Sequence, residues 1–314
     1  MTISVVIPFY NEEGSLKELY AQLTEALGGM AVEYELIFVD DGSRDSSNAL
    51  VCELRREDPR VRLITFRRNQ GKSAALSIGF QASRGEYVVT MDADLQDDPH
   101  EIPHLLSKLQ EGYDLVSGWK KRRHDPLTKT VPSRIFNAVT GVMSGIRLHD
   151  FNCGLKIYRR EVVKELSVYG ERHRFLPVLA HTQGFRVAEV AVQHHARRFG
   201  RTKFGAYRYI AGFFDLITLL FRMKFLTKPL HLFGSLGMLC LLMGAGVLVY
   251  LTIGWFQGVW IGNRPLFFLG VLGVIAGVQL FTLGLLAEMI VERTHRENLP
   301  LREDSDYQPP ASPK

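Results

Sequence analysis

The sequence predicts an α/β domain built on a parallel sheet, followed by a helical hairpin long enough to span a membrane. Two observations predict this division. As far as Arg201, short apolar runs alternate with longer helical patterns, as they do in α/β domains. From Pro229 to Ala287 the only Lys, Arg, Asp or Glu is Arg264. The first part therefore resembles a soluble enzyme in composition, and the second part does not.

Averages over the whole chain conceal this division. The 314 residues are 46% hydrophobic and 23% charged, with a mean hydropathy of zero and a net charge of +5. These values exclude a disordered, collagen-like or disulfide-framework protein. Cys52, Cys153 and Cys240 show no pairing in their spacing and fit a reducing compartment. The chain enters a strand pattern almost at once, so we expect no signal peptide.

The first part contains the alternating elements of a parallel sheet with helices on both faces. Strands are expected at 4–8, 34–40, 61–66, 86–92 and 114–117. Helices are expected near 14–27, 46–56, 73–83 and 99–110. Acidic residues follow two of these strands, Asp40 and Asp41 after the second and Asp92 and Asp94 after the fourth. Because ligands bind outside the carboxyl ends of such strands, these pairs predict a site.

Two uncharged segments, 229–256 and 265–287, each exceed the roughly 20 residues needed to cross a bilayer. The alternative is a buried hairpin within a soluble core. Trp255 and Trp260 stand at the ends of the short connector, where interfacial aromatic residues belong. Basic residues are concentrated before the first segment and after the second, so the positive-inside rule places both chain ends in the cytoplasm. We therefore expect an integral membrane protein with two spans and a tail at 288–314.

The segment 205–228 repeats aromatic and aliphatic residues at helical spacing, which predicts an amphipathic helix lying on the membrane surface. The alternative is a helix packed against the soluble domain. Within the spans, Gly273 and Gly277 form a G-x-x-x-G pattern that favours close helix packing, inside the hairpin or between copies. We expect a homo-oligomer formed through these helices.

Three short patterns resemble known ligand-binding motifs but do not meet their requirements. Gln70 to Ser73 matches the end of a phosphate-binding loop, but Phe66 occupies the position of its first glycine. The segment 100–104 reads H-E-x-x-H, yet Pro103 is incompatible with the unbroken helix that a zinc site requires. His194-His195 is interpreted as a pair at a strand end.

Asp92-Ala93-Asp94 is a stronger signal. Two carboxylates two residues apart at a strand end can hold a hard divalent cation through oxygen. Such a cation could neutralise a departing diphosphate.

Four motifs in order resemble glycosyltransferase family 2. They are Pro8-Phe9-Tyr10-Asn11-Glu12-Glu13, Asp40-Asp41-Gly42-Ser43-Arg44-Asp45, Gly71-Lys72-Ser73-Ala74-Ala75-Leu76 and Asp92-Ala93-Asp94-Leu95-Gln96. Later stretches resemble its polyprenyl-phosphate branch, which includes dolichol-phosphate mannose synthase and undecaprenyl-phosphate glycosyltransferases. They are Asp150-Phe151-Asn152-Cys153-Gly154, Glu171-Arg172-His173-Arg174-Phe175 and Arg198-Phe199-Gly200-Arg201-Thr202-Lys203-Phe204. The Gln-x-x-Arg-Trp signature of processive polysaccharide synthases is missing.

The resemblance implies a GT-A fold over 1–204 that binds a nucleotide sugar at the strand ends, with UDP-glucose as the first expectation. The residues implied for the nucleotide sugar are Pro8, Tyr10, Glu12, Asp40, Asp41, Lys72 and Asp92. The group implied for Mg²⁺ or Mn²⁺ is Asp94 with Gln96, alongside Asp92. Asp150 occupies the position of the family's catalytic base, either as a base or as an orienting group.

The acceptor implied by the resemblance is a polyprenyl phosphate in the membrane. Its phosphate is already largely anionic at pH 7, so it needs orientation and charge screening more than a strong base. Basic residues cluster at 120–134 and 197–208, and we expect Arg134, Arg198 and Lys203 to bind the phosphate. The alternative is that these clusters bind anionic headgroups. The net charge is therefore not interpreted as a nucleic-acid signal.

The expected reaction is an in-line attack by the lipid phosphate on the anomeric carbon, with inversion and release of a nucleoside diphosphate. Two other functions remain open. One is transfer to a different acceptor, such as another lipid or a protein. The other is a catalytically inactive sugar-nucleotide-binding subunit of a membrane complex, which would not need Asp92, Asp94 and Asp150 together. A transporter is disfavoured because two spans without internal charge offer no path.

Overall fold

The computed structural model describes most of the chain in two compact units, Met1–Leu216 and Ile217–Lys314. Within them it describes residues 1–121, 137, 140–141, 144–166, 168, 170, 172–195, 229–258, 260–261 and 265–295, the last five without their side chains. The predicted helix at 205–228, Arg134, Arg198, Lys203 and the tail beyond residue 295 lie outside the described residues.

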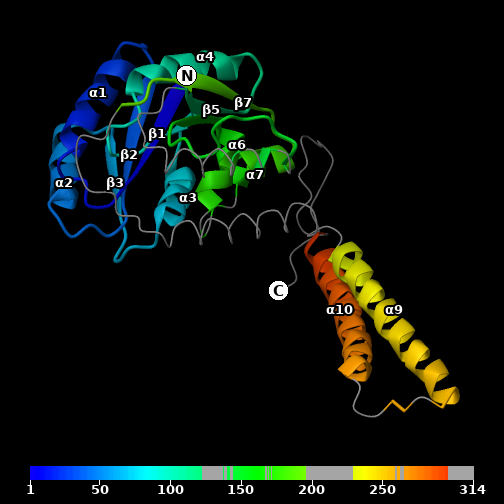
Figure 1. Ribbon diagram of the computed structural model, residues 1–314. Coiled ribbons are helices and arrows are strands. Elements are labelled where there is room, and N and C mark those ends of the chain that lie inside the picture. Colours follow the sequence, from blue (N-terminus) through cyan, green and yellow to red (C-terminus); the bar gives the residue numbers. More distant parts are fainter. Residues whose placement is uncertain are drawn as a thin grey trace. The chain divides into compact units, whose positions relative to one another are not determined.

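The first unit is built around a seven-stranded sheet with the order β3-β2-β1-β4-β6-β5-β7 (Figure 1). The strands are β1 (Thr2–Phe9), β2 (Glu33–Asp40), β3 (Val61–Thr65), β4 (Tyr87–Thr90), β5 (Leu115–Lys120), β6 (Lys156–Arg159) and β7 (Val187–Val192). The first four strands are mutually parallel, and β7 is parallel to β5. Strand β6 lies between β4 and β5 and is antiparallel to both.

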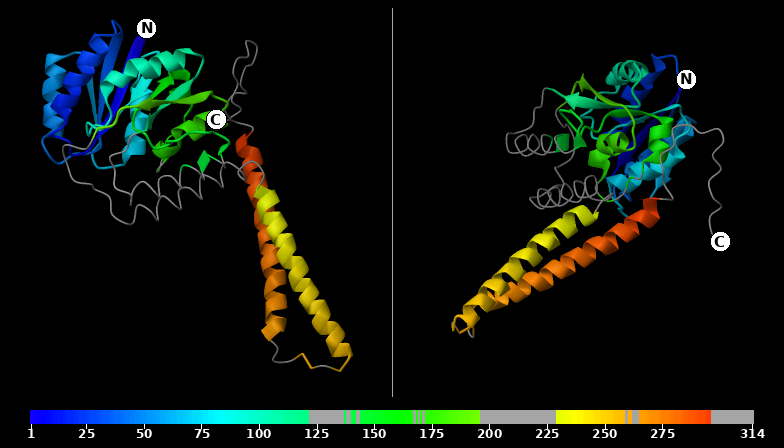
Figure 2. Two further views of the ribbon diagram at one scale, coloured as in Figure 1. Left: turned by 45° about the horizontal axis from the view of Figure 1, so that its top comes forward. Right: turned by 90° about the vertical axis from the view of Figure 1, so that its right-hand side faces the viewer.

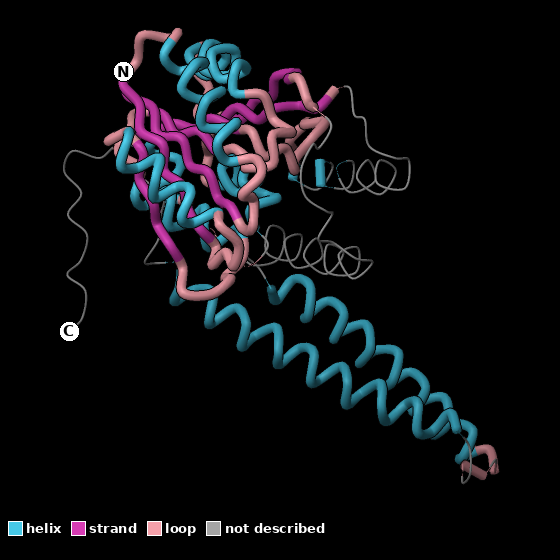
Figure 3. The backbone as a smooth tube through the Cα atoms, turned by 90° about the vertical axis from the view of Figure 1, so that its left-hand side faces the viewer, coloured by secondary structure: helices cyan, strands magenta, loops and turns pink. Residues whose placement is uncertain are grey.

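Helices cover both faces of the sheet, as the sequence predicts (Figure 3). They are α1 (Leu16–Gly28), α2 (Ser47–Glu57), α3 (Lys72–Ala82), α4 (Ile102–Gln110), α6 (Arg160–Glu165) and α7 (Leu176–Thr182), with single 3₁₀ turns at Pro99–Glu101 and Arg172–Phe175. Side chains alternate between faces along a strand, so Val5 joins the core under α1, α2 and α4, while Val6 joins the core under α3, α6 and α7.

The prediction of a purely parallel sheet is wrong at one strand. The antiparallel strand β6 spans only Lys156–Arg159, and β7 follows it without a long helical pattern that would mark a parallel crossover. Both strands were absent from the predicted set, which ended at residue 117. All five predicted strands and all four predicted helices are present, with ends that shift by a few residues.

The second unit is a helical hairpin of α9 (Pro229–Phe256) and α10 (Pro265–His295), which lie side by side in both views of Figure 2. Both are long and apolar enough to cross a membrane, over Pro229–Phe256 and Pro265–Ile290. In the most apolar 18-residue stretch of each helix, only 17% is buried in α9 and 11% in α10. This exposure argues against the alternative of a hairpin within a soluble core. The two apolar segments therefore have the dimensions and exposure expected of membrane spans.

The small residues of the hairpin lie where its two helices contact each other. A Cβ on Gly237 would stand 2.8 Å from the carbonyl oxygen of Gly277, and one on Gly244 would stand 2.7 Å from that of Gly270. The two backbones are therefore in contact, as small residues permit. At the base, Glu288 accepts a hydrogen bond of 3.1 Å from the backbone N–H of Leu230, a group that the helix itself leaves without a partner.

Candidate active site

Each of the seven strands has one end at the same edge of the sheet. Phe9 pairs with Asp40 in the parallel register of β1 and β2, so the loops after these strands begin side by side. Because β6 is antiparallel, its first residue Lys156 pairs with Thr90 at the end of β4. Strands β5 and β7 end at the same edge, where Lys120 pairs with Val192. The topology thus gathers most of the predicted site residues at the edge where α/β sheets bind ligands.

The loops after β1 and β2 are tied together by hydrogen bonds. The backbone N–H of Asn11 donates to the Ser43 hydroxyl at 3.0 Å, and that of Glu12 donates to the Ser47 hydroxyl at 2.8 Å. These bonds hold the 8–12 segment, including Pro8, Tyr10 and Glu12, beside the Asp40-Asp41 turn. The structure therefore brings together the residues that the first two motifs predict for the nucleotide.

Asp40 and Asp41 are buried and hold neighbouring backbone in place. Asp40 accepts from the backbone N–H of Ser43 at 2.8 Å and from the Asn48 amide at 2.7 Å. Asp41 accepts from the backbone N–H of Gln70 at 2.6 Å and of Gly71 at 3.0 Å. Burial raises the pKa of Asp41, and these two backbone donors oppose the rise. Asp41 thus fixes the loop that leads into α3.

A polar pocket lies beneath this edge, lined by Pro8, Lys72, Leu76, Thr90, Met91, Asp92, Asn152, Cys153, Gly154, Lys156, His173 and Leu176. At its mouth Lys72 Nζ forms an ion pair with Asp92 Oδ1, so the third and fourth motifs meet directly. Inside, Lys156 Nζ donates to the Cys153 carbonyl. Burial lowers the pKa of Lys156, and the charge of Lys72 adds to that effect. Two lysine side chains therefore face one pocket.

His173 reaches the pocket from the 3₁₀ turn before α7. Its Nδ1 lies 2.9 Å from the Ser73 hydroxyl, which also accepts the His173 backbone N–H at 3.1 Å. This contact joins the Glu171–Phe175 motif to the start of α3. The sequence predicts no role for His173, and Lys156 lies in none of the motifs.

The Asp94–Gln96 turn stands over the end of β4. Asp94 is 8% exposed and accepts the backbone N–H of Gln96 at 3.2 Å. Leu95 between them has a φ of 59°, in the left-handed region that non-glycine residues seldom occupy. The loop packs closely on the 150–156 segment, since a Cβ on Gly154 would stand 2.7 Å from the Asp92 and Asp97 carboxylates. Only glycine fits at that position.

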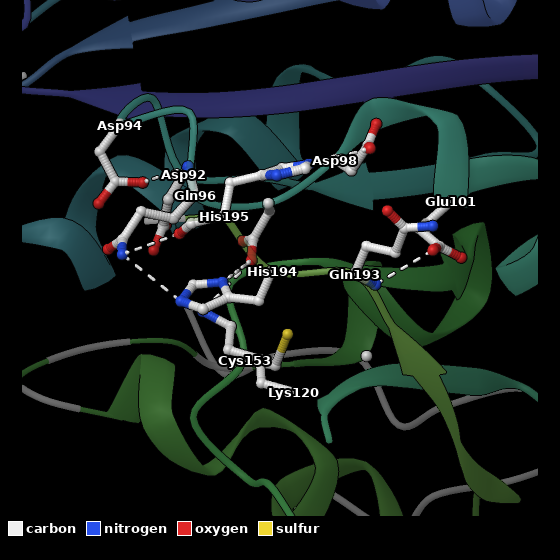
Figure 4. Close-up of polar contacts among 12 residues, drawn as sticks. Asp92, Asp94, Gln96, Asp98, Glu101, Lys120, Cys153, Gln193, His194 and His195 are labelled. Carbon is white, nitrogen blue, oxygen red and sulfur yellow. Dashed lines mark hydrogen bonds and ion pairs between the residues drawn. The ribbon is translucent and has the colours of Figure 1, made fainter. Parts of the chain in front are cut away.

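Asp97 lies beneath this turn and is 1% exposed. Two basic side chains labelled in Figure 4 lie near its carboxylate: Lys120 Nζ is 3.2 Å from Asp97 Oδ1, and His194 Nδ1 is 3.6 Å from the same atom. Burial alone would raise the pKa of Asp97, but Lys120 and His194 outweigh it and hold that pKa well below its usual range. Burial raises the pKa of the adjacent Cys153 to about 12, so its side chain is a neutral thiol.

Lys120 belongs to the basic stretch at 120–134 that the sequence assigns to phosphate or headgroup binding. Its side chain is only 16% exposed, and it is paired with Asp97 inside the domain. For this residue the assignment to an exposed headgroup-binding cluster is therefore wrong. By sequence, Lys120 could not be distinguished from the exposed Lys121 beside it, because Asp97, the partner of Lys120, is distant in the chain.

Asp150 is 2% exposed and accepts the backbone N–H of Asn152 at 3.1 Å. It precedes β6 at the same sheet edge, and its role in the reaction stays a prediction. Arg134, Arg198 and Lys203, expected to bind the lipid phosphate, lie outside the described residues. Their assignment stays a prediction.

The H-E-x-x-H segment is divided between two elements. His100 is in the 3₁₀ turn and lies 2.8 Å from Asp98, whereas His104 is in α4 and lies 3.4 Å from Glu101. Pro103 is in the first turn of α4, which begins at Ile102 and so accommodates it. The two imidazoles have separate partners. His194-His195 follows β7 after the single residue Gln193, at a strand end as the sequence predicts.

Comparisons with known proteins agree with this arrangement. Residues 4–167 match the model of the family described as Glycosyl transferase family 2. The dodecaprenyl-phosphate galacturonate synthase of Rhizobium johnstonii is 38% identical over 304 residues, covering 95% of this chain and 90% of that protein. The undecaprenyl-phosphate 4-deoxy-4-formamido-L-arabinose transferase of Pseudomonas paraeruginosa is 37% identical over 292 residues, covering 92% of this chain and 84% of that protein.

Among solved structures, the glucosyl-3-phosphoglycerate synthase of Mycobacterium tuberculosis, in complex with Mn²⁺, UDP and phosphoglyceric acid, superposes with a TM-score of 0.56. It is 23% identical, and the match covers 71% of this chain and 78% of that one. This likeness confirms the predicted GT-A-like fold, a mixed α/β sheet domain followed here by two long apolar helices that pack together. The chain belongs to glycosyltransferase family 2.

Proposed function

We propose that this chain is a membrane-anchored glycosyltransferase that moves a sugar from a nucleotide sugar to the phosphate of a polyprenyl phosphate. The observation that carries the proposal is similarity over 95% and 92% of the chain to two proteins whose names describe this class of transfer. Such coverage includes the apolar hairpin as well as the sheet domain. Family membership alone would support only the transfer of a sugar.

The geometry of the sheet edge supports a nucleotide-sugar donor. The loops after β1 and β2 supply carboxylates and backbone groups, and the pocket behind them contains Lys72 and Lys156. Ammonium groups are suited to anionic phosphate oxygens. We assign the base and ribose to the loops that carry Tyr10, Glu12 and Asp40, and the diphosphate to the side of the pocket that carries Lys72.

The donor atoms at the Asp94–Gln96 turn fit a divalent cation. A carboxylate oxygen and an amide oxygen are the hard ligands that Mg²⁺ and Mn²⁺ prefer, and Mg²⁺ is commonly bound by one or two carboxylates together with substrate phosphates. Asp94 and Gln96 would hold the ion, with Asp92 beside them. When bound, the ion would supply electrostatic stabilisation of the leaving nucleoside diphosphate.

The acceptor requires orientation rather than deprotonation, because a phosphate monoester is already largely anionic at pH 7. An oxygen of the lipid phosphate attacks the anomeric carbon, the bond from that carbon to the diphosphate oxygen breaks, and the electron pair leaves with the nucleoside diphosphate. This displacement inverts the anomeric centre. Asp150, buried at the same edge, would orient the reacting groups, and Arg134, Arg198 and Lys203 would bind the lipid phosphate.

The sugar is best proposed as a class. The names of the two relatives contain galacturonate and 4-deoxy-4-formamido-L-arabinose, so they do not support glucose in particular or even a hexose. We propose a UDP-sugar donor, with UDP-galacturonate, a UDP-4-amino-arabinose derivative and UDP-glucose as the first to compare. The hairpin would anchor the enzyme with both chain ends in the cytoplasm of a bacterium.

The test uses the full chain purified in detergent, undecaprenyl phosphate and a panel of labelled UDP- and GDP-sugars. We expect one donor to place label in the lipid fraction, with release of the nucleoside diphosphate, and EDTA to abolish the transfer. Label in no lipid fraction with any donor, together with tight UDP binding, would favour the inactive subunit instead. Label in another lipid, but not in the polyprenyl phosphate, would identify a different acceptor.

A further inference from the structure

The residue before Asp150 is held from three sides. Glu189, on β7, accepts the backbone N–H of His149 at 2.8 Å, and its other carboxylate oxygen contacts Nδ1 of the same residue. The side-chain amide of Asn137 donates to the His149 carbonyl at 2.8 Å. The imidazole stacks on Trp119 of β5, with ring centroids 4.2 Å apart and an interplanar angle of 18°. Both backbone polar groups of His149 and its ring are therefore fixed by side chains from distant parts of the chain.

Burial does not account for these contacts, because the His149 side chain is 65% exposed. An exposed residue can satisfy its backbone N–H and C=O with water, so it has no need of protein partners for both. Exposed pairs such as the one between the His149 ring and Glu189 also contribute little to stability. What the contacts do determine is the path of the backbone through residue 149.

That path sets the place of the Asp150 carboxylate. Asp150 is 2% exposed and accepts the backbone N–H of Asn152, which keeps its side chain close to its own backbone. Burial acts to lower the pKa of Lys120 and of Lys156, and Asp150 is among the groups whose charge opposes this effect. The carboxylate is therefore within electrostatic reach of the pocket, and a shift of the backbone at residue 149 would move it.

We propose that Glu189 and Asn137 are positioning residues that place the Asp150 carboxylate for sugar transfer by holding the backbone of His149 between them. This inference rests on the role of Asp150 in the proposed function. The Asn137 amide bonds the peptide group that leads directly into Asp150, and Glu189 bonds the peptide group before it. A misplacement of about 1 Å can cost about 100-fold in rate. The rate of transfer, rather than donor binding, should therefore depend on these two residues.

The test compares two substitutions of Glu189 in the full chain purified in detergent, with undecaprenyl phosphate and the donor that the panel of UDP-sugars identifies. Glu189→Ala removes both acceptor oxygens, and we expect it to lower kcat about tenfold to 100-fold while KM for the donor changes by less than about twofold. Glu189→Gln keeps an oxygen for the His149 N–H and should retain most of the turnover. Glu111→Ala is the matched control, since Glu111 is exposed and pairs with Lys108 on the surface, and it should leave kcat unchanged.

A second background separates positioning from general damage. If Glu189 acts through Asp150, its removal costs nothing further once that carboxylate is gone. In an Asp150→Ala background, Glu189→Ala should therefore change kcat by less than about twofold. Asn137→Ala releases the other side of His149, so it should lower kcat in the parent chain and have equally little effect in the Asp150→Ala background. The melting temperature and the affinity for UDP, which a loosened fold would lower, should be the same in Glu189→Ala as in the parent.

Three results would overturn the inference. They are an undiminished loss in the Asp150→Ala background, a loss of UDP affinity as large as the loss in kcat, and full turnover in the folded Glu189→Ala and Asn137→Ala variants. Full transfer by Asp150→Ala would instead remove Asp150 from the proposed function, and this inference with it, while leaving the transfer itself established. Should Asp150→Ala leave no measurable transfer, the difference between Glu189→Gln and Glu189→Ala decides the result; should Glu189→Ala fail to fold, Asn137→Ala does.

Discussion

The buried Lys120–Asp97 pair makes a large and specific prediction about stability. Lys120→Met keeps the length of the side chain but removes its charge. The Asp97 carboxylate, which is only 1% exposed, then loses the ammonium group that lies 3.2 Å from it. Breaking a buried ion pair on one side typically costs about 3–5 kcal/mol, because the remaining charge keeps its desolvation penalty. For a domain of this size each kcal/mol corresponds to roughly 2–4 °C.

We therefore expect Lys120→Met to lower the melting temperature of the full chain in detergent by about 6–20 °C. Adding Asp97→Asn should restore most of the loss, since the double variant has no uncompensated charge. Lys108→Met is the matched control, because Lys108 forms an ion pair with Glu111 on the surface and should change little. An unchanged melting temperature in Lys120→Met, or a double variant no better than the single one, would refute this reasoning.

Three further predictions address other parts of the molecule. Asp94→Asn should lower sugar transfer by about 100-fold or more, because it removes the charge that holds the cation; full transfer that still required metal would show that the ligand assignment is wrong. Burial alone would raise the pKa of Glu35, but hydrogen bonds from Ser4 and Arg62 outweigh it and lower that pKa. The ionised Glu35 therefore stabilises the folded state above about pH 4.5, and this contribution is lost as the pH falls further. Melting curves at pH 7 and pH 4 should therefore differ more for the parent than for Glu35→Gln, and parallel shifts would contradict this account. Gly277→Leu should lower the melting temperature of the chain, since its Cβ would meet a backbone nitrogen of α9 at 2.7 Å, whereas Gly246→Leu, which faces open space, should not; equal effects of both would argue against the packing of the hairpin.

Much of the sheet domain could be predicted because its signals are local. The apolar run at 34–40 and the Asp-Pro start of the 99–110 helix have the residues and spacing that their structures require. Strand β6 was missed for the converse reason, since its place between β4 and β5 depends on Thr90 pairing with Lys156 far along the chain. A four-residue strand has little periodicity of its own.

The candidate site shows the same contrast between local signals and contacts that join distant parts of the chain. Lys72 and Asp92 could be proposed from their motifs, and the structure places them in contact. Lys156 and His173 could not be assigned to the pocket, because only the antiparallel strand and the turn before α7 bring them there. His194 was interpreted correctly as a strand-end residue, but its contact with Gln96 joins residues 98 positions apart, and no sequence pattern encodes that distance.

The proposed function requires that the acceptor is a lipid phosphate. The most direct measurement offers the purified full chain a transferable UDP-sugar together with undecaprenyl phosphate, undecaprenol or diacylglycerol in parallel reactions, and identifies the lipid products by mass spectrometry. We expect a product only with undecaprenyl phosphate, with the mass of the lipid phosphate plus one sugar, and release of an equal amount of UDP. Glycosylated undecaprenol or diacylglycerol, with undecaprenyl phosphate left unmodified, would contradict it.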